Sequence, residues 1–190
     1  MTVDDRCESP VVSGRWRAAL LTVSDLGSAG QREDRSGDWL AERLPDLPSD
    51  LVLRDIVPDE HDQITRWIRR TIFHHHPALL VCTGGTGLHP RDHTPEAVRA
   101  VSDLEVPGFG EAMRRAGAEH TPHAMLSRQI AVVSQTTLVM ALPGALRATQ
   151  ESLEAVWLAL PHALEMVAGI PAASTEAGHA GLRNPDSPPQ

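Results

Sequence analysis

A short stretch that combines three glycines, an arginine and an aspartate offers the clearest chemistry in this 190-residue chain. Residues 84–87, GGTG, follow an apolar run over residues 78–82 that is too short for a helix and typical of a buried strand. The glycines allow positive φ and a close approach of the backbone to a bound group. Thr94 is a good N-cap, so a helix is predicted to begin just after Arg91 and Asp92. A glycine loop beside a helix N-terminus predicts an anion site, and a carboxylate next to it could hold a metal.

The same loop also has an interpretation without a ligand, because glycine-rich turns are common at strand ends. It is not a Walker A loop, since no Gly-Lys-Ser/Thr follows, and it lacks the GxGxxG spacing of dinucleotide-binding loops. From the loop alone, an anion site and a plain turn both stay open.

Polar residues also follow two further predicted strands, over residues 16–23 and 51–57. Ser24 and Asp25 come directly after the first strand, and Asp59 follows the second. Open α/β sheets bind ligands beyond the carboxyl ends of their strands, which makes these side chains candidate ligand contacts. Turn formation and helix capping are the alternative interpretation of all three residues.

Strands alternate with amphipathic helices along most of the chain, which predicts a three-layer α/β/α sandwich with a mostly parallel, mixed central sheet. Asp34 or Ser36 would cap the first helix, and a triple histidine closes the second. Two strands separated by Ser134-Gln135 are expected to form a hairpin-like edge. The predicted segments are a loop over 26–32, helices over 34–44, 94–101, 111–118 and 145–160, a helix that ends at 74–76, a loop or short helix over 121–127, and strands near 129–133 and 137–142.

The strand ends should bring these polar residues to one edge of the sheet, where Pro143-Gly144 adds another helix start. Several helix N-termini at one crevice suit a ligand with more than one phosphate. Asp59 and Asp92 beside bound phosphates suggest Mg²⁺, which prefers carboxylate and phosphate oxygens. Because the chain has no apparent Cys–His pair and no G-x-S-x-G elbow, metal-assisted phosphoryl or nucleotidyl transfer is the chemistry these residues can support.

Composition limits the other possibilities. The formal charge of −8 argues against a nucleic-acid partner, because phosphate backbones need a basic face. No apolar run approaches the roughly 20 residues of a membrane span, no signal-peptide core is present, and two cysteines form no framework. We therefore expect a cytoplasmic protein with an irregular arm over residues 1–14, one domain over 15–170 and a disordered tail over 171–190, rich in Pro, Ala, Ser and Gly.

Seven blocks, in order, resemble the molybdopterin-binding family, which comprises the molybdenum cofactor adenylyltransferases and their close relatives. The strongest block is TGGTGLHPRDHTPEA, at residues 83–97. The others are VSD at 23–25, DRSG at 34–37, IVPDE at 56–60, PGFGEAMR at 107–114, AMLSR at 124–128 and LPG at 142–144. Together the blocks cover roughly residues 20 to 165.

The resemblance implies Mg²⁺-dependent transfer of AMP from ATP to the terminal phosphate of molybdopterin, with release of pyrophosphate. Family aspartates required for the reaction correspond to Asp59 and Asp92, which would align Mg²⁺ and phosphate. The substrate-binding positions would be Ser24, Asp25, Gly84, Gly85, Thr86, Gly87, Arg91, Thr94, Ser127, Arg128, Pro143 and Gly144. Similar proteins assemble as trimers or hexamers, so a homotrimer or homohexamer is expected, with possible hand-over of product to a molybdenum insertase.

Three positions depart from the usual pattern of that family. Ala145-Leu146 follows LPG where many relatives carry a small polar pair, Leu26 stands where a basic residue is frequent, and His93 replaces an aliphatic residue. Two other functions therefore stay open beside the adenylyltransferase. One is a non-catalytic molybdopterin-binding protein of the same fold, and the other is a nucleotide-binding or hydrolase module with a different ligand.

Overall fold

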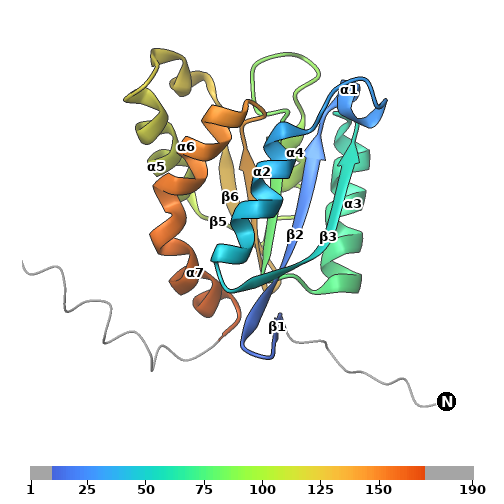
Figure 1. Ribbon diagram of the computed structural model, residues 1–190, viewed down its shortest axis with the longest axis vertical. Helices are drawn as coiled ribbons and strands as arrows, with labels where there is room; N and C mark the ends of the chain where they lie inside the picture. Colours follow the sequence, from blue (N-terminus) through green and yellow to red (C-terminus); the bar gives the residue numbers. More distant parts are fainter. Residues whose placement is uncertain (1–9, 170–190) are drawn as a thin grey trace, which may run out of the picture.

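A computed structural model describes residues 10–169 as a seven-stranded mixed sheet with helices on both faces (Figure 1). The strands are β1 Val11–Val12, β2 Arg15–Val23, β3 Ser49–Val57, β4 Leu79–Thr83, β5 Leu104–Glu105, β6 Ile130–Ser134 and β7 Thr137–Leu142. The helices are α1 Asp25–Ser28, α2 Arg35–Arg43, α3 His61–His75, α4 Thr94–Arg99, α5 Pro107–Ala118, α6 Leu146–Val156 and α7 Leu160–Val167. Short 3-10 helices span Leu44–Asp46, Pro122–Leu126 and Trp157–Ala159.

Four neighbouring strands run parallel in the order β3-β2-β4-β7, and this block fixes the direction of the sheet. On one side of the block β6 pairs antiparallel with β7 and β5 pairs antiparallel with β6, and β1 pairs antiparallel with the start of β2. Every residue of β4 and β7 is buried, as expected for strands covered on both faces. All four parallel strands therefore end at the same edge of the sheet.

Side chains that alternate along the strands divide the core into two clusters, one on each face of the sheet. In β4, Leu79 and Val81 belong to one cluster and Leu80 and Cys82 to the other. The first cluster packs against α2, α5, α6 and α7, and the second against α3 and α4 (Figure 1). The predicted three-layer sandwich with its mixed, mostly parallel sheet is confirmed.

Several local predictions differ from the structure. Residues predicted as an irregular arm include the strand β1, which lies beside β2, and β3 begins at Ser49 rather than residue 51. Part of the predicted loop 26–32 is the single-turn helix α1. The remaining arm residues and the predicted tail lie outside the described residues.

Two predictions about where helices begin and end were wrong. Thr94 is the first residue of α4 rather than its N-cap, a position that His93 occupies. The long helix predicted over 145–160 is divided into α6, a 3-10 turn and α7. Pro161 lies in the first turn of α7, and its ring excludes the hydrogen bond that a continuous helix would need.

The predicted hairpin of β6 and β7 forms, but it is not an edge of the sheet. β7 lies between β4 and β6, and the two-residue strand β5 pairs with the outer side of β6. A turn in the sequence predicts which strands are joined, whereas their place in the sheet depends on contacts far along the chain.

Candidate active site

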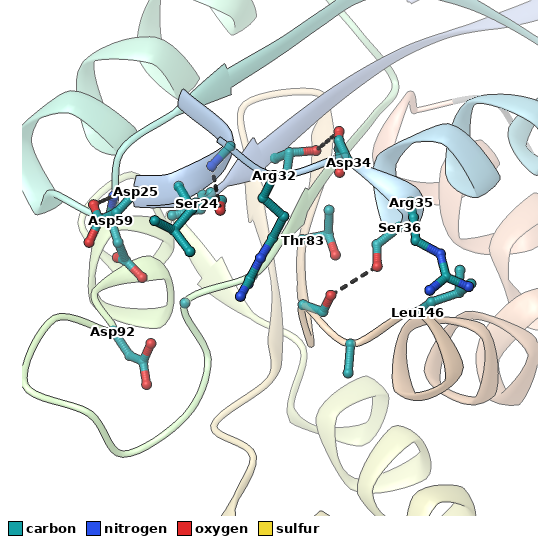
Figure 2. Close-up of a pocket in the computed structure, with 18 of the residues that line it drawn as sticks. Ser24, Asp25, Arg32, Asp34, Arg35, Ser36, Asp59, Thr83, Asp92 and Leu146 are labelled. Atoms are coloured by element: carbon teal, nitrogen blue, oxygen red, sulfur yellow. Dashed lines mark hydrogen bonds between the residues drawn. The ribbon is translucent and has the colours of Figure 1, made fainter. Parts of the chain in front are cut away.

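One cavity of about 770 Å³ lies beyond the carboxyl ends of the parallel strands (Figure 2). The residues that follow β2, β3, β4 and β7 all contribute to its lining. Eight of the predicted site residues line it: Ser24, Asp25, Asp59, Gly84, Gly85, Arg91, Asp92 and Gly144. The parallel topology therefore brings together side chains that are far apart in sequence.

Gly84 allows three strands to meet closely at the floor of the cavity. Its φ is +104°, and a Cβ there would lie 2.2 Å from the carbonyl oxygen of Val23 at the end of β2. Its N–H donates to the carbonyl of Leu142 at the end of β7, at 3.0 Å. A side chain at this position would force the strand ends apart, so the glycine is a structural requirement.

Gly85 has a different role, because it leaves room for two polar atoms. Its φ is +61°, and a Cβ would lie 2.2 Å from Asp59 Oδ2 and 2.5 Å from Thr94 Oγ1. Thr94 is fully buried, and its hydroxyl has no hydrogen-bond partner among the described residues. A buried donor without a partner costs free energy, and this hydroxyl is enclosed behind Gly85 rather than exposed to the cavity.

Asp59 lies in the turn after β3 and is only 6% exposed. Its Oδ1 accepts a hydrogen bond from the N–H of His93 at 2.8 Å, whereas Oδ2 accepts none from the described residues. Burial raises the pKa of the Asp59 carboxyl above its ordinary value, and the nearby charge of Asp92 adds to the rise. A carboxylate disfavoured by burial gains from a cation placed beside it.

Asp25 shows the opposite behaviour because Arg91 pairs with it. The guanidinium donates to both carboxylate oxygens, at 2.9 and 2.8 Å, and this hydrogen bonding lowers the pKa of Asp25. Asp25 Oδ1 also accepts the N–H of Asp59 at 3.0 Å. Arg91 and Asp25 thus hold the turn that carries Asp59, while Ser24 accepts the N–H of Gly27 and caps α1.

Asp92 is the second carboxylate that could contact a metal. Its Oδ2 accepts the N–H of His89 at 2.9 Å, and Gly87 leaves the space beside it open. Among residues 10–169, no group of three or more His, Cys, Asp or Glu side chains is placed to hold a metal ion. Two carboxylates do fit a Mg²⁺ ion that takes its remaining ligands from water and phosphate, the usual arrangement at phosphoryl-transfer sites.

The other predicted site residues do not line the cavity: Thr86, Gly87, Thr94, Ser127, Arg128 and Pro143. Arg128 donates to the carbonyls of Gly87, at 2.7 Å, and Asp92, at 2.6 Å, and it pairs with Glu96. Thr86 Oγ1 lies 3.4 Å from Ser127 Oγ. This arrangement makes Arg128 a residue that holds the loop rather than one with a free charge for phosphate.

The turn after β7 is fixed by hydroxyl groups from three elements. Thr83 and Thr149 both donate to the carbonyl of Pro143 at 2.7 Å, and Ser36 donates to that of Gly144 at 2.9 Å. α6 begins at this turn without a side-chain cap, since its N-cap residue is Ala145. Its first N–H groups are therefore available to an anion.

The cavity has two walls of different charge. The acidic wall consists of Asp25, Asp59, Arg91 and Asp92, and the basic wall of Arg32, Arg35 and the start of α6 at Ala145 and Leu146. In Figure 2 Asp25, Asp59 and Asp92 lie on one side, Arg35 and Leu146 lie on the other with Asp34 near Arg35, and Arg32 lies between the two sides.

Arg32 and Arg35 were not predicted as site residues, although Arg35 lies in the DRSG block. The signal that could have identified Arg35 was the position of this block, directly before a helix and at the crevice where the strands end. Leu26, which stands where a basic residue is frequent in similar proteins, also lines the cavity. Arg32 supplies a positive charge to the same space.

Comparison with known proteins identifies the family. The model described as "Probable molybdopterin binding domain" matches residues 19–162. The chain belongs to this family. The family and the function class predicted from the sequence blocks are therefore confirmed. Within residues 10–169, no helix is both long and apolar enough to cross a membrane.

Several relatives are named molybdopterin adenylyltransferase. Molybdopterin adenylyltransferase of Haemophilus influenzae is 36% identical over 170 residues, which cover 81% of this chain and 85% of that protein. The enzyme of the same name from Helicobacter pylori J99 is 39% identical, and the match covers 79% of this chain and 86% of that protein. A molybdenum cofactor biosynthesis bifunctional protein of Synechococcus elongatus is 40% identical, and the chain spans 47% of its length. The crystal structure of the molybdopterin biosynthesis enzyme MoaB of Thermus thermophilus superposes with a TM-score of 0.76, at 44% identity, over 80% of this chain and 96% of that one.

Proposed function

We propose that this chain is a molybdopterin adenylyltransferase that transfers AMP from ATP to the terminal phosphate of molybdopterin. An oxygen of that phosphate attacks the α-phosphorus of ATP and forms a new P–O bond. The bond between the α-phosphorus and the oxygen that bridges to the β-phosphate breaks, and its electron pair leaves with pyrophosphate. The products are adenylylated molybdopterin and pyrophosphate.

The observation that supports this proposal most directly is the pair of carboxylates, Asp59 and Asp92, that line the cavity beside the glycine loop. Asp59 Oδ2 and Asp92 Oδ1 accept no hydrogen bond from the described residues. The two carboxylates could hold a cation that also binds a phosphate oxygen, next to the backbone of Gly84 and Gly85. Positioning and electrostatic stabilisation of this kind provide most of the catalysis in phosphoryl transfer.

Adenylyl transfer generally uses a divalent metal ion, and we propose Mg²⁺ held by Asp59 and Asp92. When bound, Mg²⁺ would neutralise charge that develops on the phosphate oxygens. Asp59 must then be ionised, and its burial makes the cation the group that stabilises its charge. Arg91 and Asp25 fix the backbone of Asp59, and Arg128 fixes the carbonyl of Asp92, so both carboxylates are held before substrate binds.

Both aspartates line the cavity, which favours the enzyme over a non-catalytic molybdopterin-binding protein. A carrier would not need a buried carboxylate with a raised pKa, because that group destabilises the fold without a cation beside it. A hydrolase acting on another ligand is also disfavoured, since relatives that match most of this chain and most of their own length are named molybdopterin adenylyltransferase.

The proposal is tested by Mg²⁺-dependent pyrophosphate release from ATP, measured with and without molybdopterin. We expect release only when ATP, Mg²⁺ and the pterin are all present, together with one adenylylated pterin for each pyrophosphate. Tight pterin binding without pyrophosphate release would identify a carrier instead. Pyrophosphate release without the pterin would identify a nucleotide hydrolase.

The oligomeric state and the downstream partner stay predictions. A homotrimer or homohexamer would bury some of the large apolar side chains that are more than 60% exposed among the described residues: Phe73, Leu88, Leu104, Met125, Leu158 and Met166. Light scattering would give the mass of the assembly. Delivery of the adenylylated product to a molybdenum insertase would be measured by transfer from the purified protein.

A further inference from the structure

Arg32 and Arg35 are two cations at the cavity that no described residue pairs with. Arg32 lies in the segment between α1 and α2, and Arg35 is the first residue of α2. Both line the cavity and are exposed, and neither makes a side-chain hydrogen bond or ion pair within residues 10–169. By contrast, Arg91 on the acidic wall donates to both oxygens of Asp25.

The acidic residues next to these arginines do not neutralise them. Asp34 also lines the cavity, but its carboxylate accepts hydrogen bonds from Thr22 Oγ1, the N–H of Gly37 and Arg54 Nη2 and contacts neither arginine. Glu33 lines the cavity as well and forms no ion pair with either arginine among the described residues, so both guanidinium groups keep their N–H donors available. The uncapped N-terminus of α6, an eleven-residue helix, adds a positive electrostatic potential on the same wall.

We infer that Arg32 and Arg35 hold the β- and γ-phosphates of ATP, the part of the nucleotide that leaves as pyrophosphate. This inference rests on the proposed function, in which Asp59 and Asp92 hold the cation beside the reacting phosphates. The diphosphate then extends from the acidic wall into the rest of the cavity. In Figure 2 Arg35 and Leu146 lie on the side of the cavity opposite the acidic wall, with Arg32 between the two sides.

Charge development during the reaction explains why cations are needed there. When the bond to the α-phosphorus breaks, the electron pair remains on the bridging oxygen, and negative charge grows on the diphosphate. Arginine stays protonated throughout, so its contribution is electrostatic and requires no proton transfer. Each guanidinium offers several N–H donors in a planar fork, and two of them match a diphosphate better than a single phosphate monoester.

The experiment compares Arg32→Gln and Arg35→Gln with Arg115→Gln, which removes an exposed arginine on α5 that does not line the cavity. Calorimetry in the presence of Mg²⁺ gives the affinity for inorganic pyrophosphate, for orthophosphate and for molybdopterin. We expect each cavity variant to bind pyrophosphate roughly tenfold more weakly, with pterin affinity unchanged. The KM for ATP should rise and kcat should fall, Arg35→Lys should recover part of the loss, and Arg115→Gln should behave as the wild type.

Two results would overturn the inference. If pyrophosphate affinity is unchanged in both cavity variants, the arginines do not hold the diphosphate. If pterin affinity falls while pyrophosphate affinity does not, they hold the pterin phosphate instead. Because pyrophosphate binding is measured without the pterin, arginine-dependent binding in a protein that transfers no AMP would support this inference while refuting the proposed function.

Discussion

The acidic and basic walls line the same cavity but satisfy their charges in different ways. On the acidic wall, Arg91 pairs with Asp25, Asp25 accepts the N–H of Asp59, and Asp59 accepts the N–H of His93. On the basic wall, Arg32 and Arg35 have no partner among the described residues. The first wall is organised by the protein itself, whereas the second depends on a ligand for its counter-charges.

This difference suggests how the work of the site is divided. Substitutions in the acidic wall should change the fold and the reaction together, because the same hydrogen bonds serve both. Substitutions in the basic wall should change ligand affinity and leave stability nearly unaffected, since exposed arginines without partners contribute little to folding. The predictions that follow test this division.

The largest effect is expected from the two carboxylates of the acidic wall. Asp59→Asn and Asp92→Asn keep the side-chain shape and an acceptor oxygen but remove the negative charge that would hold Mg²⁺. We expect pyrophosphate release to fall by a factor on the order of 10³ in each variant. Asp62→Asn, a change in an exposed aspartate of α3, is the matched control. Full AMP transfer by Asp92→Asn would show that the role given to Asp92 is wrong.

A stability effect should follow from Gly84→Ala. The added Cβ would lie 2.2 Å from the Val23 carbonyl oxygen at a φ of +104°, so both strain and a backbone clash oppose it. We expect a loss of about 3 kcal/mol in the free energy of unfolding, measured by denaturant titration.

Gly30→Ala provides the control, because Gly30 also has a positive φ, +69°, but nothing lies within 4 Å of its added Cβ. Gly30→Ala should lower the free energy of unfolding by about 1 kcal/mol, because only the backbone strain at a positive φ opposes it. Equal losses for the two glycines would mean that contact between the strand ends does not explain the requirement for Gly84.

Arg128 should have an intermediate effect, because it holds the glycine loop from behind. Arg128→Lys keeps the charge but cannot reach the carbonyls of Gly87 and Asp92 together with Glu96. We expect a loss of about 2 kcal/mol of stability and a lower kcat, since Asp92 would be held less firmly. If pterin affinity fell sharply while stability and kcat stayed unchanged, Arg128 would contact the ligand directly.

The smallest effect concerns the pH dependence of stability. The pKa of Asp59 is higher in the folded protein than in the unfolded chain, so the unfolded chain releases the Asp59 proton at lower pH. As pH rises from the unfolded to the folded pKa of Asp59, the free energy of unfolding therefore decreases. Asp59→Asn removes that loss. The variant should therefore melt at a slightly higher temperature than the wild type at neutral pH, and the difference should vanish below about pH 4. A variant that is less stable at neutral pH would contradict the assigned direction.

The fold was largely predictable because its signals are local. Apolar runs and helical periodicity predicted the four parallel strands and most helices, and Asp34 caps α2 as one of two predicted candidates. The sequence did not predict β5 or the interior place of β7, since both depend on pairing between distant segments. The break between α6 and α7 had a visible signal in Pro161, which the apolar periodicity concealed.

The site was predictable in part for the same reason. Residues directly after strands were expected at one edge of the sheet, and Asp25, Asp59, Gly84 and Asp92 lie there together. Motif membership could not show the direction of each side chain. Ser127 and Arg128 belong to a quoted block, yet they support the back of the loop, while Arg35 belongs to another and lines the cavity.

Residue types and their spacing predicted the sheet with helices on both faces and the strand ends that carry the polar groups, and the resemblance of seven contiguous blocks predicted the family. These depend on short-range preferences and on motifs that are contiguous in the chain. Folding in three dimensions assigned the charges: Arg91 pairs with Asp25 across 66 positions, whereas Arg32 and Arg35 are left facing the cavity. Whether an ionic group is neutralised or available depends on distances of a few ångströms between remote segments, because electrostatic and hydrogen-bonding energies fall steeply with separation.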